Sequence, residues 1–212
     1  MAGVTTSRSP RRRDTAGRRE ELVEAGARVV AREGVAAATT RRIADEAGVP
    51  QGLVHYWFAD KNELLAEVVE TYLRGFEAAA LASTAEAEAA DSGAAQADYI
   101  LERLRAAFDV VRNDDPGRQI AMYELTTWAL RTPGSREIAR RQYVAYRATA
   151  AHLSEHWLER HGDTLPASAG VLAQLLSALF DGVVLAWLAD PETTDADAVF
   201  TLLSQLLAHR SG

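Results

Sequence analysis

Residues 39–65 read TTRRIADEAGVPQGLVHYWFADKNELL, and this stretch decides the fold of the N-terminal part of the chain. Thr39 or Thr40 is a suitable N-cap for a short helix, because a threonine hydroxyl can accept a hydrogen bond from a free amide of the first turn. Gly48 can adopt the left-handed conformation that ends this helix, and Pro50 suits the start of the next one. The stretch therefore predicts two short helices joined by a glycine turn.

The residues on either side of this stretch complete a helical unit. Apolar residues recur at helical spacing from Arg18 to Gly34, which predicts a preceding helix. Asp60 and Glu63 form a capping-box pattern in front of a long helix that begins at Lys61. Two short helices joined by a turn and packed on a preceding helix are typical of the helix-turn-helix motif.

Several residues of the motif stand at a recognisable spacing. They are Thr39, Ile43-Ala44, Ala47-Gly48-Val49, Gly52, Phe58, Lys61 and Leu64-Leu65. Over about residues 18–66 the chain resembles the TetR/AcrR family of bacterial repressors. It departs from that family at His55 and Trp57, where the family usually has tyrosine and either histidine or tyrosine. The resemblance implies an all-α fold, with a three-helix DNA-binding domain over residues 15–60 and a C-terminal helical ligand-binding and dimerisation domain over residues 61–212.

The resemblance also implies which residues bind operator DNA. From the first helix of the motif, Arg41 can reach a guanine edge, and from the second, Gln51, Leu53 and Tyr56 face bases. The phosphate contacts are expected from Thr39, Thr40, His55, Trp57 and Lys61, and Gly52 completes the predicted DNA-binding set. Arg42 is expected to be a solvated surface arginine.

The composition of the chain indicates a folded all-α protein. The hydrophobic fraction is 48%, proline numbers only 6, and alternating β-branched residues are scarce. The absence of cysteine excludes disulfides and thiolate metal sites. No apolar run approaches roughly 18 residues without a polar interruption, so we expect no transmembrane helix and a cytoplasmic protein.

The charge is divided unequally along the chain, whose net charge is −7. Residues 1–61 hold 11 Lys/Arg against 8 Asp/Glu, a net +3, and residues 62–212 hold 12 against 22, a net −10. A local positive face is sufficient to attract phosphates, and the acidic remainder keeps the rest of the protein off DNA. Residues 1–14 are predicted to be a disordered basic arm, either touching DNA or simply solvated.

The segment 167–189 reads ASAGVLAQLLSALFDGVVLAWLA and is apolar nearly all round. Such a helix must be covered on both sides. In the resembled family the last two helices form a four-helix bundle across a two-fold axis, which implies a homodimer. The expected interface residues are Leu172, Leu175, Leu176, Leu179, Val183, Leu203 and Leu206. The alternative is a core helix fully buried in a monomer.

The middle of the chain carries large side chains that suit a small-molecule pocket. They are Phe108, Met122, Tyr123, Trp128, Tyr143, Tyr146 and Trp157. We predict that an unidentified effector binds among Phe108, Met122, Trp128, Tyr143 and Tyr146. For each of these residues, simple core packing is the alternative.

Two other functions compete with this interpretation. The run His152-Leu153-Ser154-Glu155-His156 matches the H-x-x-E-H pattern of zinc proteases. No third ligand is identifiable, so we expect a chance surface pair, no metal, no cofactor and no enzymatic activity. An activator built on the same fold is the other alternative. The sequence thus predicts a homodimeric transcriptional regulator, a repressor that a small molecule releases from a palindromic operator.

Overall fold

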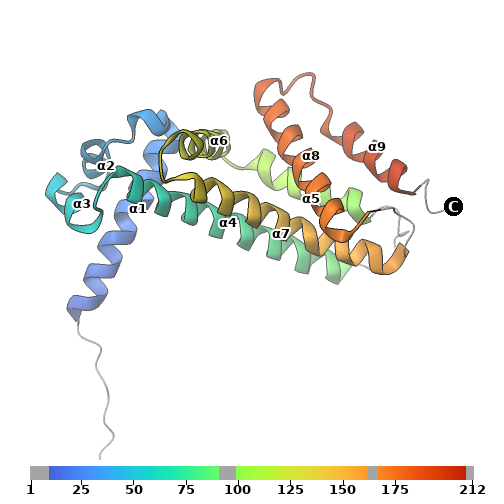
Figure 1. The fold of residues 1–212 in the computed structure, drawn as a ribbon, viewed down its shortest axis with the longest axis horizontal. Helices are drawn as coiled ribbons and strands as arrows, with labels where there is room; N and C mark the ends of the chain where they lie inside the picture. Colours follow the sequence, from blue (N-terminus) through green and yellow to red (C-terminus); the bar gives the residue numbers. More distant parts are fainter. Residues whose placement is uncertain (1–9, 91–98, 162–166, 209–212) are drawn as a thin grey trace, which may run out of the picture.

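The computed structural model describes residues 10–90, 99–161 and 167–208, and over these ranges all regular secondary structure is helical. The prediction of an all-α fold is therefore confirmed. Figure 1 shows α2 and α3 at one end of the molecule, α4 and α7 running along its length, and α8 and α9 at the other end. The helices are α1 (Pro10–Ala37), α2 (Thr40–Ala47), α3 (Gln51–Trp57), α4 (Lys61–Ala90), α5 (Tyr99–Asn113), α6 (Pro116–Arg131), α7 (Arg136–His161), α8 (Ala169–Ala189) and α9 (Ala196–Ala208).

The N-terminal segment differs from the predicted arm over residues 1–14. Residues 1–9 lie outside the described residues, whereas residues 10–14 belong to α1. Pro10 occupies the first helical position, where the missing N–H of proline costs no hydrogen bond. Helix α1 is interrupted at Gly34, whose φ of 84° lies in the region that favours glycine. The predicted end of the first helix corresponds to this interruption.

One hydrophobic core joins the helix-turn-helix to the middle of the molecule. It contains buried side chains from α1, α2, α3, α4, α6 and α7, among them Val29, Ile43, Val54, Leu64, Leu125 and Ile138. Helix α6 begins directly against α1, since a Cβ at Gly117 would lie only 2.4 Å from the carbonyl oxygen of Ala31. The two predicted domains therefore share buried surface, and their boundary between residues 60 and 61 stays a prediction.

A second core lies at the other end of the molecule. It is built by α5, α7, α8 and α9 around Ile100, Phe108, Trp157, Leu176 and Phe200. Within the described residues, α8 is the one helix long and apolar enough to cross a membrane. The core helix of a folded domain meets the same criterion, so this finding does not contradict the expectation that the chain has no transmembrane helix. One face of α8 is buried in the second core, where Leu172, Leu176, Val183 and Val184 pack.

Candidate functional site

The turn between α2 and α3 has the predicted local geometry. Thr39 is the N-cap of α2, and its hydroxyl accepts a hydrogen bond from the amide of Arg42 at 3.1 Å. Gly48 ends α2 with a φ of 67°. The capping box of α4 also forms, since Asp60 accepts from the amide of Glu63 at 2.9 Å. The carboxylate of Glu63 accepts from the Ala59 amide, one residue earlier than the usual partner.

Helix α3 has one buried side and one exposed side. Val54 and the adjoining Phe58 are buried in the first core, and the guanidinium of Arg19 lies 4.9 Å from the centre of the Phe58 ring. On the opposite side, the Tyr56 side chain is 73% exposed. A large aromatic group so exposed to water is unusual for a side chain that has only a packing role.

The structure places most of the predicted DNA-binding residues on this exposed side or next to it. Gln51 donates a hydrogen bond to the Thr40 hydroxyl at 3.2 Å, which links α3 to α2. Exposed residues of the predicted set are Thr39, Arg41, Gln51, Gly52, His55 and Tyr56, and Thr40 and Leu53 are half-buried. These eight residues form a continuous candidate interface, which we call the α2–α3 face.

Two predicted phosphate contacts point elsewhere. The indole nitrogen of Trp57 is buried and has no hydrogen-bond partner, and the ring packs edge-on against Tyr56 at 5.0 Å. The ammonium group of Lys61 donates to the carbonyl oxygen of Val35 at 2.8 Å, and burial lowers the pKa of Lys61. Both donors are thus directed into the protein, and we remove Trp57 and Lys61 from the candidate interface.

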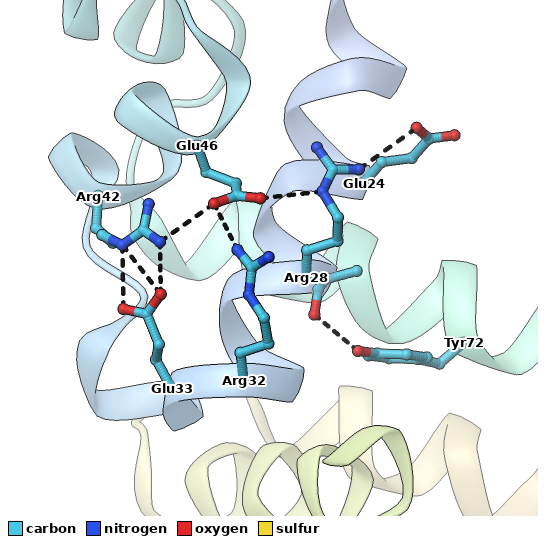
Figure 2. A network of polar contacts seen from close by, with 8 residues as sticks. Glu24, Arg28, Arg32, Glu33, Arg42, Glu46 and Tyr72 are labelled. Atoms are coloured by element: carbon cyan, nitrogen blue, oxygen red, sulfur yellow. Dashed lines mark hydrogen bonds and ion pairs between the residues drawn. The ribbon is translucent and has the colours of Figure 1, made fainter. Parts of the chain in front are cut away.

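A network of ion pairs fixes α2 on α1. Glu46, only 15% exposed, accepts hydrogen bonds or ion pairs from Arg28, Arg32 and Arg42, and Arg42 also pairs with Glu33 (Figure 2). The arginines lower the pKa of Glu46, with the hydrogen bond from Arg28 contributing most. Arg42 is therefore part of the packing of α2 on α1 rather than the solvated arginine that we expected.

The neighbouring Arg41 behaves differently. It is exposed and has no hydrogen bond or ion pair with any residue that the structure describes. The other arginines near the motif, such as Arg19, Arg28 and Arg42, are paired with carboxylates. Arg41 is consequently the cation of the α2–α3 face that is available to an external anion or base.

The backbone of Val35 is held by hydrogen bonds at both its amide and its carbonyl group. Its amide donates to the carboxylate of Glu124 on α6 at 2.6 Å, and its carbonyl accepts from Lys61 at the start of α4. The interruption at Gly34 allows this approach, since a Cβ there would lie 2.9 Å from Glu124. We call this arrangement the Val35 clamp. Sequence reasoning missed it, because Glu124 lies 89 residues from Val35.

An aromatic and polar cluster lies where α4, α6, α7 and α8 meet. Tyr143 of α7 donates to the Asp181 carboxylate of α8 at 2.9 Å, and Tyr123 of α6 donates to the Asp181 carbonyl at 2.9 Å. The Tyr146 ring lies 5.6 Å from Tyr143 and 5.1 Å from Phe76 of α4. We call these five residues the tyrosine cluster.

Hydrogen bonds and burial define the chemistry of this cluster. Gln142 donates to the Tyr146 hydroxyl at 3.0 Å and accepts from the buried hydroxyl of Thr126 at 2.8 Å. Burial raises the pKa of Tyr146 to about 12. Burial and the hydrogen bond to Asp181 raise the pKa of Tyr143 to about 12, and burial also raises the pKa of Tyr123. All three phenols are therefore neutral at physiological pH.

The predicted effector residues do not all lie together. Tyr143 and Tyr146 belong to the tyrosine cluster, and the Met122 carbonyl accepts a hydrogen bond from Thr126 beside it. Trp128 packs against the first core, as Met122 and Tyr146 also do, but within the described residues no hydrogen bond or ring contact joins it to the tyrosine cluster. Phe108 lies in the second core and lines an open hollow of about 650 Å³ between α5 and the start of α9. Prediction from sequence left out Phe76 and Asp181, and it named Tyr123 only in the wider set of large side chains that suit a pocket.

The predicted dimer interface needs a similar correction. Leu172, Leu176 and Val183 are buried in the second core, so they cannot form the outer surface of a subunit. Leu179 and Leu203 are half-buried, while Leu175 and Leu206 are exposed. Exposed apolar residues at helical spacing form two stripes, Val171, Leu175 and Leu185 on α8 and Val199, Leu202 and Leu206 on α9. Apolar surface of this kind marks interaction sites.

The H-x-x-E-H run lies on α7 near its C-terminal end. His152 and Glu155 are exposed, and the side chain of His156 lies outside the described residues. No group of three potential metal ligands occurs within residues 10–90, 99–161 and 167–208. The described side chains therefore add no support to the zinc hypothesis.

Comparison with known proteins extends these observations. Residues 22–68 match the family model of bacterial regulatory proteins, tetR family, and residues 94–209 match the tetracyclin repressor-like C-terminal domain. The chain is 28% identical over 181 residues to the HTH-type nicotine-responsive transcriptional repressor HdnoR of Paenarthrobacter nicotinovorans, covering 84% of this chain and 87% of the relative. It is 32% identical over 199 residues to the HTH-type transcriptional regulator BetI 2 of Chromohalobacter salexigens, covering 91% and 89%.

A solved structure gives the same result at the level of the fold. The multidrug binding protein EbrR, complexed with ethidium, has a TM-score of 0.66 with this chain at 25% identity. The match covers 89% of this chain and 98% of that one.

Proposed function

The chain belongs to the TetR family and is a DNA-binding transcriptional regulator, and we propose that it is a homodimeric repressor which a small-molecule effector releases from a palindromic operator. The relatives in the comparison are regulators, and we propose no enzymatic activity for this chain. Its place of action is the cytoplasm, where operator DNA is accessible.

The α2–α3 face is the proposed contact with DNA. The single observation that carries this proposal is an exposed surface of α3 with Gln51 and Tyr56, next to an arginine, Arg41, that pairs with no carboxylate of the described residues. An arginine free to move can form a bidentate contact with guanine or bind a phosphate. Glutamine has the matching groups for adenine, and the phenol of Tyr56 can donate to phosphate.

The apolar stripes of α8 and α9 support the homodimer. A monomer in water would leave Leu175 and Leu206 exposed by 49% and 60%, and a second copy could cover them. A stable interface of this kind buries on the order of 1,500 Å² in total. Two-fold symmetry then places two identical α3 helices about one DNA turn apart or somewhat more, so the operator is palindromic.

The Val35 clamp supports a route from the effector to DNA. Helix α6 carries Tyr123, which belongs to the tyrosine cluster, and the next residue, Glu124, which holds Val35 beside α2. A shift of α6 on effector binding therefore acts directly on the end of α1. HdnoR is described as nicotine-responsive, and EbrR has been crystallised with ethidium and with imidazole, which supports control by small molecules.

Selection of bound duplexes from a random DNA pool, followed by a small-molecule release assay, tests this function. We expect the wild-type protein to select a near-palindromic consensus sequence. The Arg41→Ala variant should lose the base preference at one symmetric pair of positions in that consensus. Arg136→Ala, which alters an exposed arginine at the start of α7, is the matched control and should leave the consensus unchanged. Failure of the wild-type protein to enrich any sequence would contradict the proposal. A footprint relative to the promoter distinguishes a repressor from an activator.

A further inference from the structure

The carboxylate of Asp181 has an unusual position. It lies on α8, otherwise the most apolar helix of the described chain, and it is half-buried. Its one side-chain partner within the described residues is the Tyr143 hydroxyl, and it forms no ion pair with any described arginine, lysine or histidine. A carboxylate can accept about four hydrogen bonds, and removing it from water without a cation is costly.

The Tyr143 hydroxyl that donates to this carboxylate belongs to an array of aromatic rings from two other helices. Tyr143 and Tyr146 lie edge to face, and Phe76 of α4 packs edge to face with Tyr146. The faces of such rings carry negative charge density and attract cations within about 6 Å. Asp181 is the one acidic side chain of the tyrosine cluster, and no described cationic side chain pairs with it.

We propose that the effector of this protein is an organic cation, a protonated amine or a quaternary ammonium, held by the carboxylate of Asp181 and the rings of Tyr143 and Tyr146. The proposal rests on the proposed function, which requires an effector site in the C-terminal helices. An ammonium group supplies the cationic partner that no described side chain provides for the Asp181 carboxylate. Its alkyl or aryl substituents can pack on the aromatic rings. An anionic effector is excluded here because it would meet an uncompensated carboxylate.

The position of the site also explains how its occupation reaches the DNA-binding end. The backbone carbonyl of Asp181 accepts the Tyr123 hydroxyl, and Tyr123 precedes Glu124 on α6. A cation drawn between Asp181 and Tyr143 changes the spacing of α7 and α8. Tyr123 connects that change to α6, and Glu124 connects it to the Val35 clamp.

A matched pair of ligands tests the charge requirement. Choline and its uncharged carbon isostere, 3,3-dimethylbutan-1-ol, have nearly the same shape, and ethidium serves as a larger aromatic cation. Binding is measured by calorimetry, or by ethidium fluorescence, on the full-length protein without DNA. We expect at least one of the two cations to bind and the uncharged isostere to bind at least about tenfold more weakly than choline or not at all.

Variants of the cluster locate the binding. Asp181→Asn keeps the size of the side chain and an acceptor for Tyr143 but removes the charge, so cation affinity should fall at least about tenfold. Asp181→Glu retains the charge and should keep more affinity than Asp181→Asn, and Tyr146→Leu should weaken binding by removing a ring. Asp109→Asn is the matched control, because Asp109 lines the separate hollow beside Phe108. Circular dichroism checks that each variant is folded, and Tyr146→Leu keeps the test valid where Asp181→Asn does not fold.

The outcomes separate this proposal from the proposed function. If both cations fail to bind the wild-type protein, or if the loss of affinity falls on Asp109→Asn and not on Asp181 or Tyr146 variants, the cation site is wrong. Operator selection is carried out independently of these ligands. A protein that selects a palindrome but responds only to neutral or anionic compounds retains its proposed function and loses the cation proposal.

Discussion

Replacement of Glu124 by alanine is the most direct perturbation of the link between the C-terminal helices and the helix-turn-helix. In the wild-type protein the Glu124 carboxylate accepts the Val35 amide at 2.6 Å in a partly buried setting. Alanine leaves this amide without an acceptor. The unmade hydrogen bond costs about 1–3 kcal/mol of folding free energy. Glu124→Gln retains a neutral acceptor, so we expect a smaller loss, about half as large.

These free energies translate into measurable changes. For a chain of this size the unfolding midpoint falls by about 2–4 °C for each kcal/mol, so Glu124→Ala should lower Tm by on the order of 2–12 °C. Amide hydrogen exchange gives a local measurement, because the Val35 amide loses its acceptor and should exchange faster. Glu137→Ala is the control, since Glu137 forms an exposed pair with Arg140 one turn away on the same helix.

The result that would refute the clamp is specific. If Glu124→Ala changes Tm no more than Glu137→Ala does, and exchange at Val35 stays at the wild-type rate, the hydrogen bond does not stabilise the junction of α1 and α2. Faster exchange confined to Val35 and its neighbours, with a lower Tm, supports the clamp as the place where α6 acts on the DNA-binding end.

Four further predictions follow from individual residues. Arg41→Ala should weaken operator binding by about 1–3 kcal/mol in a gel-shift titration, and an unchanged affinity would remove Arg41 from the interface. Leu175→Glu should yield a folded monomer in sedimentation at micromolar concentration, whereas Leu176→Glu should unfold the protein because that side chain is 1% exposed. Lys61→Ala should lower Tm and leave the salt dependence of operator binding unchanged, because the ammonium group donates to a backbone carbonyl. A flatter salt dependence in this variant would show that Lys61 contacts a phosphate. The arginines lower the pKa of Glu46 below its ordinary value of 4.5. The ion pairs of Glu46 therefore stabilise the folded protein fully above about pH 4.5, and this stabilisation is lost as the pH falls through the lowered pKa. The Tm difference between wild type and Glu46→Gln should therefore shrink in acid, and a constant difference would contradict this.

The predicted DNA-binding residues illustrate how far sequence alone could locate a site. The exposure of Tyr56 followed from the periodicity of α3, because a seven-residue helix with Val54 turned inward must turn Tyr56, two residues later, outward. The direction of long side chains did not follow. Lys61 could reach either solvent or Val35, and the position of α1 decided between them.

The C-terminal helices were harder to predict for a related reason. The sequence showed that α8 is apolar on nearly every side, but it did not show which leucines face the core. That choice depends on the rotation of α8 against α7, which buried Leu172 and Leu176 and left Leu175 exposed. The same rotation brought Asp181 to Tyr143, which lies 38 residues earlier in the chain.

The sequence by itself determined the helix-turn-helix, the all-α class and the positions of the caps and turns. These features depend on neighbours a few residues apart: the Thr39 cap, the left-handed Gly48 and the pairing of Asp60 with Glu63. Only the tertiary structure decided the partners of Val35 and the members of the tyrosine cluster. A hydrogen bond across 89 residues, such as that from Val35 to Glu124, exists only after the helices pack, and close packing fixes their rotation through all core side chains at once.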